Sequence, residues 1–253
     1  NFLNFLSQLS NNTKWQSFRE TTLKNIAQKG LFDHIEGGFF RYCTDENWDI
    51  PHFEKMLYDN GQLISVFSNY DLIIKKNIYA ELVEKTIEFW LCIKAENIFF
   101  PSSIDADNVD GEGGYYLFKK PQILENLNKK EIEYCQLNFS MTDKSLKENK
   151  WHMHKKETIS SVFEENLLSK LKDLRTANLF PAVDTKAICS WNCMMIMGLI
   201  DASITYQNSK WFEIAETTTH LILNNFCNED QCYRLVYSNK IITGTLEDYS
   251  WLV

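Results

Sequence analysis

The spacing of the apolar residues constrains the fold of this chain more than any other feature. Between its four prolines and nine glycines lie long stretches in which apolar residues recur at helical spacing, and those two residue types interrupt helices most often. In the clearest stretch, from about residue 75 to 95, apolar side chains occupy one face and charged ones the other. The apolar face consists of Ile78, Leu82, Ile87, Phe89 and Trp90. The pattern predicts a mainly α protein.

Nine helical segments are expected. One is opened by Pro51, because proline lacks an N–H and suits the first turn of a helix, and it continues through Phe67. The others lie near residues 2–9, 14–29, 75–95, 121–137, 157–177, 186–206, 209–226 and from 246 to the end. Two stretches, 99–120 and 231–245, break the helical pattern, and we expect short β-hairpins in them.

A weak internal repeat relates two of the expected helix pairs. A shift of 132 positions aligns Asn60 with Asn192 and Tyr79 with Trp211. Each aligned half is a helix, a short turn and a second helix. Because such αα-hairpins cannot each bury an apolar face alone, they are expected to pack side by side into a solenoid or a closed ring.

Charge and apolar content limit the partners. The chain has 26 Lys plus Arg against 34 Asp plus Glu, a formal net charge of −8, and no basic block that would neutralise phosphates. No apolar run approaches the roughly 18 to 20 residues that span a bilayer, and the first residues lack a cationic leader region. We therefore expect no nucleic acid, no membrane and a cytoplasmic location.

The cysteines are expected to be reduced thiols. Seven of them are scattered through apolar segments, whereas a disulfide framework uses an even set that punctuates short loops. Cys189 and Cys193, four positions apart on an expected helix, could hold a metal with His152 and His154. The favoured interpretation is that Cys189 and Cys193 are buried reduced thiols, so no metal is expected.

Four groups of residues form a sequence pattern that identifies a protein family more specifically than the amino-acid composition does. They are Gly30–Tyr42 continuing through Trp48 to 51–60; Ser103–Asp107 with Glu112, Tyr115 and Tyr116; Asp184–Asn192; and Leu246–Tyr249. In this order, and over nearly the whole chain, they resemble the DUF255 family of thioredoxin-domain-containing proteins, typified by bacterial YyaL and by spermatogenesis-associated protein 20.

The resemblance implies a thioredoxin-like domain followed by an (α/α)6 toroid similar to N-acylglucosamine 2-epimerase and the six-hairpin glycosidases. We expect these residues to lack the first domain, and no Cys-x-x-Cys pair occurs among them, so thioredoxin redox chemistry is not expected. Residues 1–253 are expected to form a single α/α-toroid domain, incomplete at the C-terminus, with about nine of twelve helices. The unclosed seam would favour oligomers.

His52 is the expected catalytic base. At a helix N-terminus after Pro51, the helix dipole would disfavour its imidazolium form, and a neutral imidazole can take a proton from a carbon next to a carbonyl. Asp59 would share its helix face and act as the companion group, whereas Glu54 would point far round the helix. Capping or loop-bracing roles stay open for His52, and His34 is either a second acid/base or a loop brace.

Ten further residues are expected to bind substrate. They would supply stacking aromatics, bidentate hydrogen bonds and carboxylates for a polar ring. For the loop carboxylates an Asx turn is the alternative, and the final acidic pair also suits a helix N-terminus. The ten are Arg41, Tyr42, Trp48, Asp105, Asp107, Glu112, Trp191, Asn192, Glu247 and Asp248.

Two functions follow from these residues and from the resemblance. The first is a carbohydrate-active enzyme of the N-acylglucosamine 2-epimerase type, an epimerase or isomerase before a glycosidase, acting on a small carbohydrate by His52-mediated proton transfer without a cofactor. The second is a non-catalytic toroid that binds a glycan or protein and, in full-length relatives, partners the thioredoxin-like domain.

Overall fold

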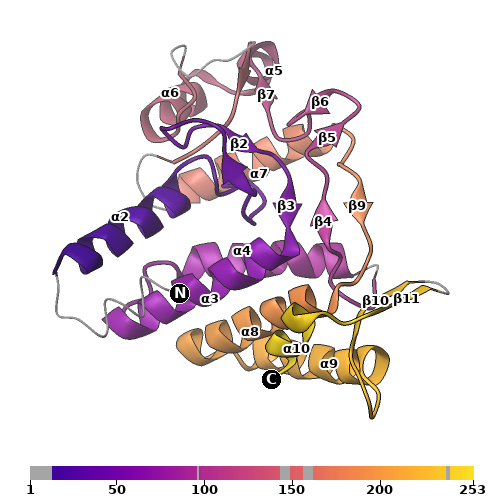
Figure 1. Cartoon of the computed structure of the whole chain (residues 1–253). Coiled ribbons are helices and arrows are strands. Elements are labelled where there is room, and N and C mark those ends of the chain that lie inside the picture. The colour runs from indigo at the N-terminus through magenta and orange to yellow at the C-terminus, as the bar shows by residue number, and fades with distance from the viewer. Residues whose placement is uncertain (1–12, 96, 143–148, 156–161, 238–239) are drawn as a thin grey trace. The chain divides into compact units, whose positions relative to one another are not determined.

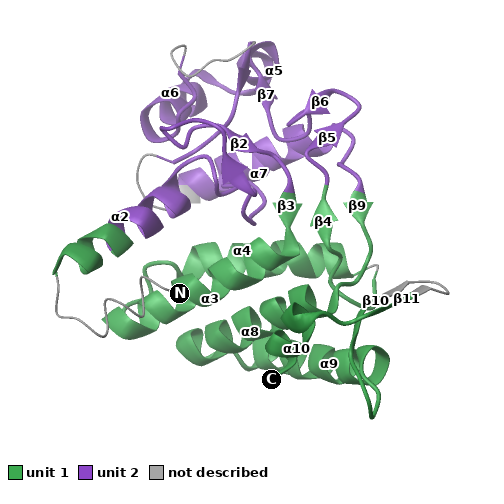
Figure 2. Cartoon of the chain, viewed as in Figure 1, with its two compact units in different colours: residues 1–19, 55–104, 183–253 green, residues 20–54, 105–182 purple. Residues whose placement is uncertain are grey.

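The computed structural model (Figure 1) describes residues 13–95, 97–142, 149–155, 162–237 and 240–253. Its contacts divide the chain into two compact units, each assembled from separate stretches of sequence (Figure 2). Unit 1 comprises Asn1–Arg19, Lys55–Ile104 and Val183–Val253, and unit 2 comprises Glu20–Glu54 and Asp105–Ala182. The single domain expected over 1–253 stays a prediction, and the helix expected near 2–9 lies outside the described residues.

Unit 1 contains two pairs of helices, and the two helices of each pair follow one another in the chain. The first is α3 (Leu57–Ile74) with α4 (Ala80–Lys94), and the second is α8 (Cys189–Tyr206) with α9 (Ser209–Phe226). The helices of each pair pack against each other, and α10 (Leu246–Leu252) packs on α8. Adding 132 to the bounds of α3, 57 and 74, gives 189 and 206, the bounds of α8. The predicted repeat is confirmed.

The two related helices also share their local hydrogen bonding. The amide Nδ2 of Asn60 donates to the carbonyl of Met56, and Nδ2 of Asn192 donates to the carbonyl of Ile188. Both helices end on a residue with φ of 55°, Lys75 in α3 and, 132 positions later, its counterpart in α8. This left-handed residue closes each helix, as is common at C-termini.

Two glycines let the backbones of α3 and α8 approach closely. A Cβ built on Gly61 would lie 2.7 Å from the amide nitrogen of Met195, and one built on Gly198 would lie 2.5 Å from the carbonyl oxygen of Gly61. No side chain fits at either position without moving the helices apart. The interface therefore depends on these two glycines.

We expect Gly61→Ala to lower the free energy of unfolding by about 1–3 kcal/mol, the usual cost of overpacking. The sign is diagnostic, because alanine in place of glycine normally stabilises a helix by about 1 kcal/mol. Urea unfolding followed by circular dichroism measures the change. Gln62→Ala, one position along α3, is the control and should stay within about 0.5 kcal/mol; a stabilised Gly61→Ala would contradict the close approach.

Short strands complete unit 1. β3 (Lys55–Met56), β4 (Ser103–Ile104) and β9 (Val183–Asp184) form an antiparallel sheet in the order β3-β4-β9. β10 (Tyr233–Tyr237) and β11 (Lys240–Thr243) form the hairpin expected within 231–245.

Unit 2 is smaller and mixes helices with two-residue strands. α2 (Thr13–Gln28) begins in unit 1 and ends in unit 2, which also holds α5 (Lys120–Asn126), α6 (Lys129–Asn138) and α7 (Val162–Thr176). Its strand pairs are β1 (Tyr42–Cys43) with β2 (Pro51–His52), β5 (Asp107–Asn108) with β6 (Gly111–Glu112), and β7 (Phe118–Lys119) with β8 (Lys150–Trp151). All three pairs are antiparallel.

Two apolar clusters form the core of unit 2. The first lies among the helices and includes Phe118, Phe139, Trp151 and Leu171. The second supports the β1–β2 hairpin and consists of Leu31, Phe40, Phe53, Ala106, Tyr115 and Tyr116. Buried aromatic side chains therefore pack beneath the β1–β2 hairpin.

The predicted fold class, mainly α with short β-hairpins in loops, is confirmed. The helix expected to open at Pro51 is wrong: α3 begins at Leu57, because residues 51–56 are used in strands β2 and β3. The segment expected at 121–137 is two helices, since Asn128 caps α6 in a reciprocal capping box with Glu131. Closure of the helix pairs into an (α/α)6 ring, complete or incomplete, stays a prediction.

Within the described stretches, none of the helices has the length and apolarity that a bilayer crossing requires.

Candidate functional site

The β1–β2 hairpin of unit 2 positions Tyr42 and His52 side by side. The two residues are cross-strand partners, and such partners share a face of an antiparallel pair. Their rings stack with centroids 5.2 Å apart at an interplanar angle of 27°. Tyr42 is 51% exposed, so one aromatic surface of this pair faces solvent.

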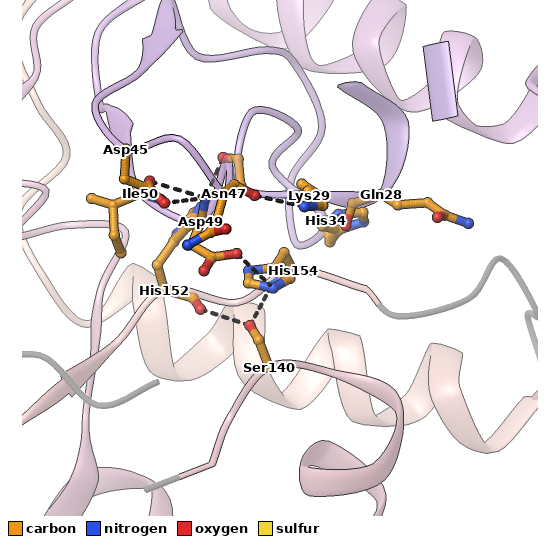
Figure 3. Close-up of polar contacts among 11 residues, drawn as sticks. Gln28, Lys29, His34, Asp45, Asn47, Asp49, Ile50, Ser140, His152 and His154 are labelled. Carbon is orange, nitrogen blue, oxygen red and sulfur yellow. Dashed lines mark hydrogen bonds and ion pairs between the residues drawn. The ribbon is translucent and has the colours of Figure 1, made fainter. Parts of the chain in front are cut away.

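The loop that joins β1 to β2 is held by its own side chains. One carboxylate oxygen of Asp45 accepts the amide hydrogens of Asp49 and Ile50 at 3.0 and 2.7 Å (Figure 3). Lys29 donates to the carbonyl of Asn47 at 2.7 Å, which ties the loop to the end of α2. These hydrogen bonds hold the loop of the β1–β2 hairpin, which carries His52.

The neighbouring hairpin, β5–β6, brings Glu112 to His52. A Cβ on Gly113 would lie 2.6 Å from the ring of Phe53, so glycine is needed where β6 passes over this ring. The backbone there also has a φ of 69°, which favours glycine. This close passage places Oε1 of Glu112 2.6 Å from Nδ1 of His52.

Glu54 and Arg41 lie on the other side of the imidazole. Oε2 of Glu54 is 3.8 Å from Nε2 of His52 and accepts a hydrogen bond from Nη1 of Arg41 at 2.8 Å. We call Arg41, Tyr42, His52, Glu54 and Glu112 the His52 cluster. The His52 side chain is 27% exposed, so the cluster is open to a dissolved ligand.

The contacts of His52 define its chemistry. A carboxylate can only accept, so Nδ1 of the imidazole donates to Glu112, and in the neutral ring the lone pair is then on Nε2. Carboxylates that bond one ring nitrogen fix both the tautomer and the ring orientation. Nε2, with Glu54 beside it, is the nitrogen able to exchange a proton with a ligand.

Three predicted residues of unit 2 have other surroundings. Asp105 accepts the amide hydrogen of Asp107 at 3.1 Å in an Asx turn, and Asp107 is the cross-strand partner of Glu112. Trp48, with a φ of 62°, packs against the second apolar cluster and offers its carbonyl to Gly30. Asp105 and Asp107 thus border the His52 cluster through the β5–β6 hairpin, whereas Trp48 supports the loop.

Asp59, Trp191 and Asn192 belong to unit 1. Asp59 lies in the first turn of α3, so the shared helix face predicted for it and His52 is wrong, because His52 is in a strand. The ring of Trp191 lies 4.8 Å from that of Tyr58. Asn192 is fully buried and bonds both backbone groups of Phe100 as well as the carbonyl of Ile188, contacts that serve the fold.

Glu247 and Asp248 open α10, also in unit 1. Arg234 donates to both carboxylates, at 2.9 and 3.2 Å. Burial would raise the pKa of Asp248, but hydrogen bonds from Thr245 and Ser190 outweigh it and hold that pKa below its usual value. Asp248 caps α10 and bonds Ser190 of α8, and both carboxylates bind Arg234 of β10.

Sequence reasoning missed Glu54 as a neighbour of His52. On a helix the two side chains would diverge, but in extended backbone residues i and i+2 face the same way. Read as a strand, the alternation His52-Phe53-Glu54 would have placed the polar residues together and buried the phenylalanine between them, as the structure does.

Three histidines lie inside unit 2 (Figure 3). Nε2 of His34 lies 3.1 Å from the carbonyl of Gln28, Nε2 of His152 donates to the carbonyl of Gly30 at 2.8 Å, and Nε2 of His154 lies 3.5 Å from Asp49. Burial lowers the pKa of His34 to about 3 and that of His152 to about 4. The contact with Gln28 links His34 to the end of α2, and both of the predicted roles of His34 stay predictions.

In the part of the chain that the structure describes, no group of three or more His, Cys, Asp or Glu side chains is arranged to hold a metal ion.

The curated proteins similar to this chain include an uncharacterised protein from Caenorhabditis elegans, 25% identical over 92% of this chain and 38% of that protein. Human spermatogenesis-associated protein 20 is 22% identical over 92% of this chain and 36% of its own length. Mouse spermatogenesis-associated protein 20 is 35% identical over 42% of this chain and 14% of its own length. The resemblance predicted from the motifs is confirmed, and the chain spans well under half of these relatives.

No family model matches the chain. Among solved structures, a D-mannose isomerase matches 94% of this chain and 58% of its own at 15% identity and a TM-score of 0.29. A sugar epimerase from a ruminal bacterium matches 88% of this chain and 76% of its own at 11% identity and a TM-score of 0.25.

Proposed function

We propose that the His52 cluster is an acid–base site that epimerises or isomerises a small carbohydrate. The observation that carries the proposal is the 2.6 Å contact between Glu112 Oε1 and His52 Nδ1. It leaves Nε2 as the basic nitrogen of a half-buried ring, next to the carboxylate of Glu54. The proposal concerns this chain, which is only part of the length of its relatives.

The His52 cluster contains the acid–base groups that an aldose epimerase or isomerase needs. An aldose epimerase or isomerase removes a proton from a carbon next to a carbonyl and returns a proton to the same or the adjacent atom, which suits a histidine with a second acid nearby. Glu54, held by Arg41, is the candidate second group within unit 2. The exposed face of Tyr42, stacked on His52, can receive the apolar face of a sugar ring. The companion role of Asp59 stays a prediction.

Proton NMR in deuterated water tests the proposal. We expect the chain to place deuterium at the carbon next to the carbonyl of at least one free hexose or N-acylhexosamine. His52→Ala should reduce that rate by about 10²–10⁴-fold, the usual contribution of a general base. Glu112→Gln should reduce it less, because the base remains but its orientation is lost.

Glu125→Gln is the matched control, since Glu125 is an exposed carboxylate on α5 of the same unit. It should leave the exchange rate unchanged, and circular dichroism should give the same folded spectrum for all variants. Equal rates for His52→Ala and the unmodified chain would overturn the proposal.

A non-catalytic glycan-binding surface is the second candidate, and the exposed Tyr42 ring beside Arg41 favours it. It requires saturation transfer from protein to sugar without any deuterium incorporation, and loss of that transfer in Tyr42→Ala. A protein partner, oligomer formation and the cytoplasmic location stay predictions.

A further inference from the structure

Two of the cysteines flank one tight turn in unit 1. Cys227 follows the last residue of α9, and Cys232 precedes β10. The turn between them, residues 228–231, is held by Oδ1 of Asn228, which accepts the amide hydrogens of Asp230 and Gln231 at 3.0 and 2.9 Å. The two cysteines are therefore held at a fixed distance by the turn.

The backbone pairs the two cysteines directly. Cys227 and Cys232 are partners in an antiparallel bridge. The adjacent amide of Asn228 donates to the carbonyl of Gln231, and the amide of Cys232 donates to the hydroxyl of Tyr249 instead of to its bridge partner. This pattern defines a non-hydrogen-bonded pair, in which the Cα atoms are about 4.5 Å apart and the side chains approach most closely.

The other close cysteine pair in unit 1 has a different geometry. Cys189 and Cys193 are four residues apart on α8, and Cβ atoms at this helical spacing are about 5–6 Å apart. A disulfide needs a Cβ separation of about 3.5–4.5 Å. The backbone pairing of the turn lies within this range, whereas the helical spacing exceeds it, although the thiols of Cys189 and Cys193 are hydrogen-bonded to each other.

We propose that Cys227 and Cys232 form an intramolecular disulfide when the chain meets a small-molecule disulfide such as oxidised glutathione. The thiolate of Cys227, the more exposed of the two, attacks one sulfur of glutathione disulfide and releases a glutathione thiolate. The thiolate of Cys232 then attacks the Cys227 sulfur of the mixed disulfide and releases the second glutathione. The two cysteines lose two electrons and two protons, and the disulfide becomes two glutathione thiols.

The cross-link would fix a junction of unit 1. The carbonyl of Cys232 accepts the amide hydrogen of Gly244, at the end of β11, and its amide bonds Tyr249 of α10. Joining Cys232 to Cys227 would tie this junction to the end of α9. Burial raises the pKa of both thiols, so the reaction is expected to be slow at neutral pH.

Peptide mapping tests the proposal, because trypsin separates the two cysteine pairs. Residues 211–234 form one tryptic peptide, which contains Cys227 and Cys232, and residues 187–210 form another, which contains Cys189 and Cys193. The reduced, folded chain is incubated with oxidised glutathione, free thiols are alkylated, and the digest is analysed by mass spectrometry without reduction. We expect the 211–234 peptide to be lighter by two hydrogens and unalkylated.

The internal disulfide in 211–234 should be at least about tenfold more abundant than one in 187–210 at the same glutathione disulfide concentration. Cys232→Ser should convert it into a glutathione adduct on Cys227, whereas Cys189→Ser should leave it unchanged. Cys193 also lies near Cys227 and Cys232, so a disulfide that joins the two peptides overturns the proposal. Equal oxidation of the two peptides, or an alkylated 211–234 peptide under conditions that oxidise the urea-unfolded chain, overturns it as well.

Discussion

Replacing Arg175 by alanine is expected to lower the free energy of unfolding of unit 2 by about 3–5 kcal/mol, the cost of breaking a buried ion pair. Nη1 of Arg175 donates to both carboxylate oxygens of Asp33 at 2.8 Å and to Glu36 at 3.3 Å. The side chains of Arg175 and Asp33 are 2% and 1% exposed. Alanine would leave the Asp33 carboxylate buried without this partner.

Hydrogen exchange of unit 2 peptides, together with urea unfolding, measures this loss. Lys170→Ala is the control on the same helix, because Lys170 is 41% exposed and pairs with Glu131 near the surface, where a pair contributes at most about 1 kcal/mol. The double variant Arg175→Met with Asp33→Asn should lose less than Arg175→Ala, since the principal buried pair then carries no charge. Similar losses for Arg175→Ala and Lys170→Ala would contradict the buried pair.

Lowering the pH from 7 to 4 is expected to weaken unit 2 by several kcal/mol through His34 and His152. Burial lowers the pKa of both, to about 3 and about 4, and the charge of Lys155 also lowers that of His34. An unfolded histidine titrates near 6.5, so below that pH the unfolded chain binds protons that the folded chain does not. This stability is fully present above about pH 6.5 and is lost as the pH falls towards 4 and 3.

The groups that face the two imidazoles are Asp33, Lys155 and His154 for His34, and His154, Asp33 and Arg175 for His152. Urea unfolding at several pH values between 7 and 4 gives the slope of stability against pH. His34→Gln should reduce that slope by about 1.4 kcal/mol per pH unit, the value for one proton.

His220→Gln is the control for the acid prediction. His220 is exposed on α9 of unit 1, so its substitution removes an imidazole without removing a buried one. An unchanged slope in His34→Gln, with a folded protein at pH 7, would show that the acid sensitivity has another origin.

The sequence predicts the helices of unit 1 well, because their signal is local and repeated. The apolar spacing predicts both bounds of α9 and the C-terminal bound of α8, whereas α3, expected from Pro51 through Phe67, lies at Leu57–Ile74. The same pattern carries no signal for the contact at Gly61, which depends on a second helix more than a hundred positions away.

The candidate site was predicted only in part, and the reason is the conformation around His52. Proline suits a helix start and an edge strand equally, and at Pro51 the strand prevails because β1 pairs with it. The partners of His52 change with that choice: Glu54 comes close and Asp59 belongs to α3. Glu112 was named in the right loop, but its contact depends on how Gly113 passes the Phe53 ring.

The interleaving of the two units has a consequence for gene engineering. Three stretches of unit 1 alternate with two of unit 2, so the chain passes from one to the other four times. Neither unit can be expressed as a contiguous fragment, and removing residues 20–54 or 105–182 alone deletes only part of unit 2. A single-chain version of either unit would need new linkers that rejoin its separate stretches.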